Sequence, residues 1–124
     1  MIAADTSSFV AYLSGETGND VNVLDMALEQ NQIVLPPIVL VELLSDPHLP
    51  PKIAGFFKHI PLMGLEEGIW ERAGALRAKI LAHGLKSRLA DALIAQVCID
   101  HRCPLITRDR DFRHYARWGG LQLI

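Results

Sequence analysis

Short apolar segments alternate with helical patterns along the chain, and this alternation limits the possible folds more than any other feature. The apolar segments cover residues 1–4, 33–35, 60–63, 105–106 and 121–124. Between them, apolar side chains recur at helical spacing in residues 9–13, 19–31, 38–44, 52–58, 66–83 and 87–100. Short buried strands that alternate with helices indicate a parallel sheet with helices on both faces. We therefore expect an α/β fold: a single-domain, three-layer α/β/α sandwich over residues 1–124 with a mostly parallel sheet of four to five strands.

The composition is that of an ordinary folded domain, with 50% apolar and 21% charged residues. The densest apolar stretch, residues 33–44, contains two prolines and Glu42, so it falls short of the roughly 20 residues of a membrane span. No Lys or Arg precedes Lys52, so we expect no secretory signal. Two cysteines are too few for a disulfide framework. These features predict a cytoplasmic protein that does not enter a membrane.

The net charge of −2 hides a strong asymmetry along the chain. Residues 1–51 hold seven acids and no Lys or Arg, whereas residues 52–124 hold seven acids and all twelve Lys and Arg. The first segment therefore has a net charge of −7 and the second a net charge of +5. An acid in the first segment can form an ion pair only with the distant second segment.

Three acids occupy positions that the apolar pattern assigns to the interior. Asp5 follows the strand predicted at residues 1–4, Glu42 lies within the apolar helix 38–44, and Asp91 interrupts the helix 87–100, which is apolar on nearly every side. A buried carboxylate costs several kcal/mol unless a partner or a metal compensates its charge. A helix cap or an ion pair would be the ordinary explanation for any one of them. For Asp5 and Glu42 the sequence offers no nearby base.

A fourth group of polar residues, Thr107, Asp109 and Asp111, follows the strand predicted at 105–106. Sites in parallel sheets form beyond the carboxyl ends of the strands, so Asp109 can face Asp5 there. Asp111 competes with Asp109 for this place, and we favour Asp109 because it is nearer the strand.

If Asp5, Glu42, Asp91 and Asp109 converge, they form a cluster of oxygen ligands that favours Mg²⁺ or Mn²⁺ over zinc. The histidines show no metal-ligand spacing, and the sequence has no Gly-rich phosphate loop and no nucleophile motif. Metal-assisted hydrolysis is the remaining chemistry.

Four motifs in a fixed order carry a family resemblance. They are Asp5-Thr6-Ser7, Val41-Glu42-Leu43, the run from Asp91 to Ala95, and Thr107-x-Asp109-x-Asp111-Phe112. With them the whole chain resembles the PIN-domain ribonucleases, in particular the VapC-like toxins of toxin–antitoxin systems. The resemblance implies a PIN-like sandwich that cleaves RNA with Mg²⁺ or Mn²⁺ as cofactor. It also implies a cognate antitoxin protein and a homodimer as partners.

Carried over motif by motif, the resemblance assigns roles to individual residues. It makes Asp5, Glu42, Asp91 and Asp109 catalytic, with Asp5, Asp91 and Asp109 holding the metal. It makes Thr6, Thr107 and Asp111 the residues that orient the acids. An antitoxin segment would enter an apolar groove supplied by the early helices, with the residues Val10, Tyr12, Leu13, Leu40 and Leu44.

An RNA substrate needs basic surroundings. Arg110, Arg113 and Arg117 are spaced to form one face of a helix, although an ordinary solvated helix face explains this row equally well. The other candidates flank Asp91 and Asp109, and they are Lys86, Arg88 and Arg108.

Two other kinds of protein fit parts of the sequence. One is a PIN-like module that binds RNA or protein without cleaving it. The other is a phospho-acceptor receiver domain, which would need paired acids after its first strand, whereas Asp5 stands alone. Mg²⁺ affinity measured together with RNA cleavage separates the three.

Overall fold

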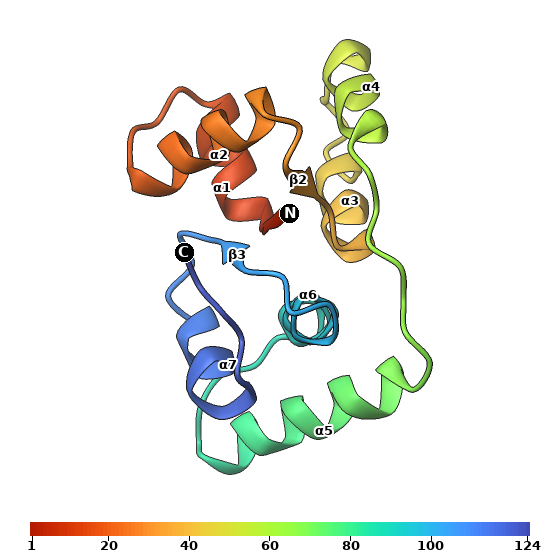
Figure 1. The fold of residues 1–124 in the computed structure, drawn as a ribbon, viewed down its shortest axis with the longest axis vertical. Helices are drawn as coiled ribbons and strands as arrows, with labels where there is room; N and C mark the ends of the chain where they lie inside the picture. Colours follow the sequence, from red (N-terminus) through yellow and green to blue (C-terminus); the bar gives the residue numbers. More distant parts are fainter.

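A computed structural model describes residues 1–124 and contains seven helices and three short strands (Figure 1). The strands are β1 (Ile2–Ala4), β2 (Ile33–Val34) and β3 (Leu105–Ile106). The helices are α1 (Thr6–Leu13), α2 (Asn19–Glu29), α3 (Pro37–Leu44), α4 (Pro51–His59), α5 (Ile69–Ala82), α6 (Leu89–Asp100) and α7 (Phe112–Gly119). Each helix predicted from the apolar periodicity is present, with bounds shifted by a few residues.

The sheet is parallel, with the strand order β2-β1-β3. Its three strands are fewer than the four to five predicted. The segments predicted as further strands each contribute one isolated parallel bridge, Leu62 to Leu35 and Leu123 to Leu105. The carbonyl of Pro61 accepts the Leu35 N–H, so the Pro61 nitrogen faces the same neighbour and has no hydrogen to donate. The pairing beside β2 therefore stops after a single bridge.

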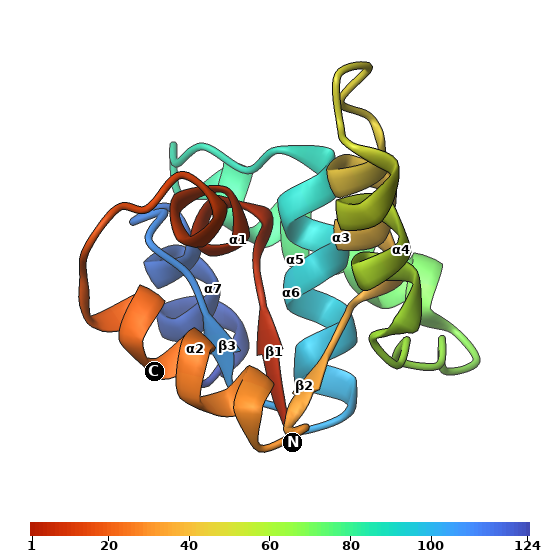
Figure 2. The same ribbon diagram turned by 90° about the horizontal axis from the view of Figure 1, so that it is seen from above.

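The helices form layers on both sides of the sheet, as the α/β/α prediction requires. Figures 1 and 2 show α1 and α2 on one face of the sheet and α5, α6 and α7 on the other, with α3 and α4 beyond the β2 edge. No helix is both long enough and apolar enough to span a bilayer. Because β1 and β3 are parallel neighbours, their carboxyl ends open at one edge of the sheet.

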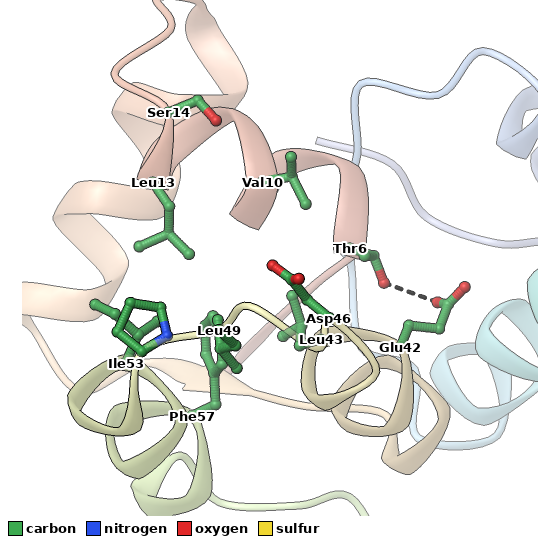
Figure 3. Close-up of a pocket in the computed structure, with 11 residues that line it drawn as sticks. Thr6, Val10, Leu13, Ser14, Glu42, Leu43, Asp46, Leu49, Ile53 and Phe57 are labelled. Atoms are coloured by element: carbon green, nitrogen blue, oxygen red, sulfur yellow. Dashed lines mark hydrogen bonds between the residues drawn. The ribbon is translucent and has the colours of Figure 1, made fainter.

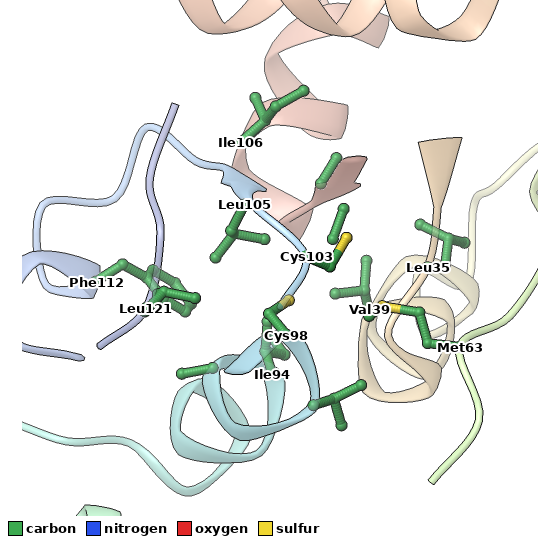
Figure 4. Close-up of a cluster of buried hydrophobic side chains, with 14 of the residues drawn as sticks. Leu35, Val39, Met63, Ile94, Cys98, Cys103, Leu105, Ile106, Phe112 and Leu121 are labelled. Carbon is green, nitrogen blue, oxygen red and sulfur yellow. The ribbon is translucent and has the colours of Figure 1, made fainter. Parts of the chain in front are cut away.

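Helix α6 supplies the centre of the core, as its all-round apolar pattern predicts. The side chains of Ile94, Val97 and Cys98 are fully buried. Figure 4 shows Ile94 and Cys98 among apolar side chains of the sheet and the surrounding helices, including Leu105. Burial of each large apolar side chain contributes about 1.5–3 kcal/mol. This packing fixes α6 within the core of the molecule.

Helix α1 begins earlier than the sequence predicts. It starts at Thr6, directly after β1, with Asp5 in the N-cap position, so Ser7 and Ser8 lie within the helix and do not cap it. The two serine hydroxyls bind carboxylates instead: Ser7 donates to Asp5 and Ser8 donates to Asp20. The early start turns Asp5 into the space beyond the sheet.

Candidate active site

Asp5 is buried at the carboxyl end of β1, with 4% of its surface exposed. Its backbone N–H donates to the carbonyl of Ile106, which sets Asp5 beside Thr107 of the neighbouring strand end. The hydroxyls of Ser7 and Thr107 donate to the same carboxylate oxygen, Oδ2, at 2.8 and 2.9 Å. Burial raises the pKa of Asp5, while these two hydrogen bonds favour the ionised form. Asp5 is therefore held in one orientation by neutral donors and not by a base.

Asp91 lies in the first turn of α6, where the helix dipole favours a negative charge. Its pKa is raised from 3.8 to about 6, chiefly by burial and then by the nearby carboxylates of Asp5, Asp109 and Glu42, against a smaller opposite effect of Arg88. These four acids come from four separate segments of the chain. The other three lie near enough to Asp91 for their charges to act on it.

The segment after β3 is held in place by a short chain of hydrogen bonds. The Thr107 hydroxyl accepts the Asp109 N–H at 3.1 Å, and Asp109 Oδ1 accepts the Asp111 N–H at 2.9 Å. Asp109 is among the groups that raise the pKa of Asp91. Asp111 occupies the N-cap position of α7. This arrangement favours Asp109 over Asp111 as the fourth acid of the site.

Glu42 is exposed, so the expectation that it is interior is wrong. Helix α3 lies at the edge of the molecule and turns Glu42 and Val41 outward, and Val41 is 65% exposed. The Thr6 hydroxyl donates to Glu42 Oε1 at 2.7 Å and so joins the start of α1 to α3 (Figure 3). Glu42 therefore stands at the rim of the site, and it needs no buried partner.

The donor set of the site is chemically suited to a hard divalent cation. None of the ion pairs in the structure involves Asp5, Glu42, Asp91 or Asp109. No three His, Cys, Asp or Glu side chains lie close enough to hold a metal ion as they stand. Like charges repel, and three of the four carboxylates are turned to hydroxyl or N–H donors. A cation would supply the compensating charge through oxygen ligands, the kind that Mg²⁺ and Mn²⁺ prefer.

The family is settled by comparison with known domains. The model of the PIN domain family matches residues 2–117. The chain belongs to the PIN domain family. A comparison with curated proteins found no significant match.

Three solved structures share the fold of this PIN domain. The first contains VapBC2 from Rickettsia felis bound to a DNA fragment from their promoter; identity is 23%, the TM-score is 0.76, and 100% of this chain and 98% of that chain are covered. The second is VapBC-5 from Mycobacterium tuberculosis, of the VapBC family of toxin–antitoxin systems, with 20% identity, a TM-score of 0.67, and 99% and 96% coverage. The third is FitAcB from Neisseria gonorrhoeae, with 19% identity, a TM-score of 0.71, and 100% and 96% coverage.

The basic residues around the PIN site differ in their exposure and in whether their side chains already contact other parts of the protein. Lys86 and Arg88 are exposed beside α6. Arg110 and Arg113 are exposed and line a cavity of about 280 Å³ that Asp109 also lines. Arg117, the third residue of the same row, lies over the Trp118 ring at 4.8 Å and does not line this cavity.

Arg108, the remaining RNA-binding candidate, is already engaged within the protein. Its guanidinium donates two hydrogen bonds to Asp20, both of 2.9 Å, and one to the Thr17 carbonyl at 3.0 Å. Glu16 lies 3.4 Å from the same group. The side chain of Arg108 is thereby turned toward the α1–α2 loop.

An apolar groove of about 360 Å³ lies beside Glu42, between α1, α3 and α4 (Figure 3). Val10 and Leu13 of α1 line it, as predicted. Tyr12, Leu40 and Leu44 do not line it; the Tyr12 hydroxyl donates instead to Asp25 of α2. Thr6 and Glu42 form the end of the groove nearest the acids.

Ser7 is the site residue that the sequence alone did not single out. Its hydroxyl donates to Asp5 and accepts the backbone N–H of Arg108 at 3.2 Å. It therefore connects the β1 end of the site to the β3 end. The signal available in the sequence was the run of three hydroxyl residues, Thr6, Ser7 and Ser8, directly after a strand-ending Asp.

Proposed function

We propose that this PIN domain is a Mg²⁺- or Mn²⁺-dependent endoribonuclease and acts in the cytoplasm as the toxin of a toxin–antitoxin pair. The observation that supports the proposal is that the carboxylates of Asp5, Glu42 and Asp109 act on the charge of Asp91, while none of the four acids forms an ion pair. A cluster of carboxylates that raises the pKa of one of its members is costly for folding alone. It is useful where a cation and a phosphodiester must be bound together.

Each acid has a role that its surroundings support. Asp5, Asp91 and Asp109 would hold the cation, which when bound lowers the pKa of water and neutralises charge developing on the phosphate. Thr107 and Ser7 fix the Asp5 carboxylate through Oδ2, and Thr107 also fixes the backbone of Asp109. Glu42, held by Thr6 at the exposed rim, would orient the attacking water.

RNA would reach the acids across a basic margin. Lys86, Arg88, Arg110 and Arg113 are exposed on the two sides of the site, next to Asp91 and Asp109. Such side chains bind phosphates without reading sequence. Arg110 and Arg113 are the leading candidates because they share a cavity with Asp109 and, unlike Arg108, which also lines it, their side chains form no hydrogen bond or ion pair within the protein.

The proposed antitoxin contact is the groove between α1, α3 and α4. It is lined by apolar side chains such as Val10, Leu13 and Phe57 and ends at Thr6 and Glu42. A segment seated there would lie against the acids and could block RNA. Two of the similar structures contain VapBC complexes, which supports this kind of partner. The exposed apolar side chains of Trp70 and Leu89 support a homodimer contact.

The deciding experiment measures cleavage of single-stranded RNA by the purified chain with Mn²⁺, with Mg²⁺, and with EDTA. We expect cleavage only with the cations, and a loss on the order of 1,000-fold, about 4 kcal/mol of transition-state stabilisation, for Asp91→Asn. Asp100→Asn is the matched control on the same helix, since Asp100 pairs with Arg72 away from the site. Cleavage in EDTA, or undiminished cleavage by Asp91→Asn, would contradict the proposal. RNA binding without cleavage would indicate the binding module instead.

A further inference from the structure

Arg108 joins two parts of the chain that are far apart in sequence. It lies between Thr107 and Asp109, and its side chain reaches the N-terminal turn of α2. Nε and Nη2 of its guanidinium donate to Oδ2 and Oδ1 of Asp20, each at 2.9 Å. This bidentate pairing fixes both the distance between the two side chains and the orientation of the guanidinium. Arg108 is thus a tie between α2 and the loop after β3.

Asp20, which accepts these two hydrogen bonds, is itself held in place by a further contact. Asp20 Oδ2 also accepts the hydroxyl of Ser8, which is fully buried in α1. The Arg108 hydrogen bonds lower the pKa of Asp20 to about 2, so the carboxylate stays ionised well below neutral pH. Asp20 is consequently a fixed anchor and not a mobile surface acid.

The backbone around the pair leaves room for it. Gly18 has a φ of 151°, and a Cβ there would lie 2.7 Å from Asp20 Oδ1 and 2.8 Å from Arg108 Nη2. A side chain at position 18 would therefore force the Asp20–Arg108 pair apart. The absence of a side chain at Gly18 therefore leaves the space that the guanidinium occupies.

The same arginine is held at its backbone by the site itself. Its N–H donates to Ser7 Oγ, the hydroxyl that donates to Asp5. With main chain and side chain both fixed, Arg108 allows little freedom to its two neighbours. Those neighbours are Thr107, which donates to Asp5, and Asp109.

We propose that the Asp20–Arg108 pair positions Thr107 and Asp109 for binding of the divalent cation, and that Arg108 does not contact RNA. This rests on the proposed metal-dependent function. Arg108 and Asp20 are positioning residues, since the guanidinium and the carboxylate bind each other and neither forms a hydrogen bond with the acids of the site. Loss of a group that orients metal ligands typically lowers metal affinity about 10–100-fold.

The test compares two binding measurements on the intact chain. Mn²⁺ affinity is measured by isothermal titration calorimetry, and affinity for a fluorescent single-stranded RNA is measured in EDTA. Asp20→Asn and Arg108→Ala should each weaken Mn²⁺ binding about tenfold or more and leave the RNA affinity in EDTA within roughly twofold of the wild type. The double variant should lose no more than the larger single loss, because both changes break the same tie.

Asp25→Asn is the matched control, an Asp on the same helix that binds Tyr12 and not Arg108. It should keep both affinities. Arg108→Lys is a conservative variant for the case that the other variants lose affinity because they unfold. It retains the charge but not the bidentate hydrogen bonding, so it should lose part of the Mn²⁺ affinity and none of the RNA affinity.

The opposite pattern overturns the inference. If Arg108 contacts RNA, Arg108→Ala weakens RNA binding in EDTA, Arg108→Lys restores it, and Asp20→Asn leaves Mn²⁺ affinity unchanged. Unchanged Mn²⁺ affinity in Asp20→Asn alone is also sufficient to reject the positioning role. If the wild type and Asp25→Asn both fail to bind Mn²⁺, the proposed function itself fails, and the positioning role fails with it.

Discussion

The carboxylate of Asp91 has 9% of its surface exposed and lies near three further carboxylates in the first turn of α6. Burial is the main reason that its pKa rises from 3.8 to about 6, and the other acids add to the rise. At neutral pH the Asp91 carboxylate is therefore ionised in the folded protein, although its charge is more stable in the solvated, unfolded chain. At this residue the requirements of the site oppose those of stability.

We expect Asp91→Asn to stabilise the cation-free protein at pH 7. The folded pKa of about 6 lies above the unfolded value of 3.8, so the folded state holds the proton more tightly. The contribution of Asp91 to stability is therefore fully present below pH 4, and up to about 3 kcal/mol of it is lost as the pH rises from 4 through 6. Asn cannot ionise and escapes this loss. Thermal unfolding in EDTA at pH 4 and pH 7 measures the effect, with a higher Tm for the variant at pH 7 only.

Asp100→Asn provides a control of opposite sign. The Arg72 hydrogen bonds lower the pKa of Asp100, so its contribution is present above pH 4 and is lost as the pH falls through the folded pKa. This variant should be less stable than the wild type at pH 7. A Tm for Asp91→Asn at or below that of the wild type at pH 7 would show that the acids do not repel one another as described.

Among the elements, the helices were predictable and the sheet was less so. Helical periodicity is local, and it found six of the seven helices, while the spacing of the arginines after Asp109 indicated the seventh. The strands have only two or three residues each, and the extent of edge pairing depends on partners such as Pro61 that are remote in sequence. Helix α3 is apolar on all sides, so its pattern could not show which face is covered. This is why the exposure of Glu42 was missed.

The sequence singles out Asp5, Glu42 and Asp91 because each ends or interrupts an apolar segment, and Asp109 because it follows a predicted strand. The role of Arg108 was not predictable, because its partner Asp20 lies on another element and both look like ordinary surface charges in the sequence. The contact appears only when α2 folds against the loop after β3. A sequence pattern shows an acid that interrupts an apolar segment. It does not show which two surface charges form an ion pair, because that depends on how distant elements fold together.

Packing of α7 against α5 gives a test at the level of elements. A Cβ on Gly119, the last residue of α7, would lie 2.6 Å from Leu76 Cδ1 and 3.3 Å from Ile99 Cδ1. Gly119→Ala should therefore lower the free energy of unfolding by about 1–3 kcal/mol through overpacking. Gly74→Ala, within α5, meets no atom within 4 Å and should raise it by up to about 1 kcal/mol. Urea unfolding of both variants checks the contrast, and equal changes would refute the close approach.

At the scale of the whole molecule, folding partly cancels the asymmetry of charge. Arg108, from the basic segment 52–124, neutralises Glu16 and Asp20 of the acidic segment 1–51. Asp5 and Glu42 from the same acidic segment gain no base. Lys86, Arg88, Arg110 and Arg113 are exposed and form no ion pair; Arg110 and Arg113 share a cavity with Asp109, and Arg88 lies near enough to Asp91 to act on its charge. The folded molecule thus combines an uncompensated acidic centre with a basic margin, the distribution that cation and polyanion binding together require.

This distribution leads us to expect that RNA affinity depends on Arg110 and Arg113 but not on Arg117. Each phosphate contact to a single strand contributes about 0.7 to the slope of log affinity against log salt, so the double variant Arg110→Ala/Arg113→Ala should reduce that slope by about 1.4. Arg117→Ala, on the same helix but over Trp118, should leave the slope unchanged. Fluorescence anisotropy in EDTA across a range of salt concentrations measures all three proteins without cleavage. If the double variant and the wild type have the same slope, RNA binds elsewhere on the protein. If Arg117→Ala lowers the slope as much per arginine as the double variant does, all three arginines of α7 bind phosphate alike, and the cavity beside Asp109 has no special role.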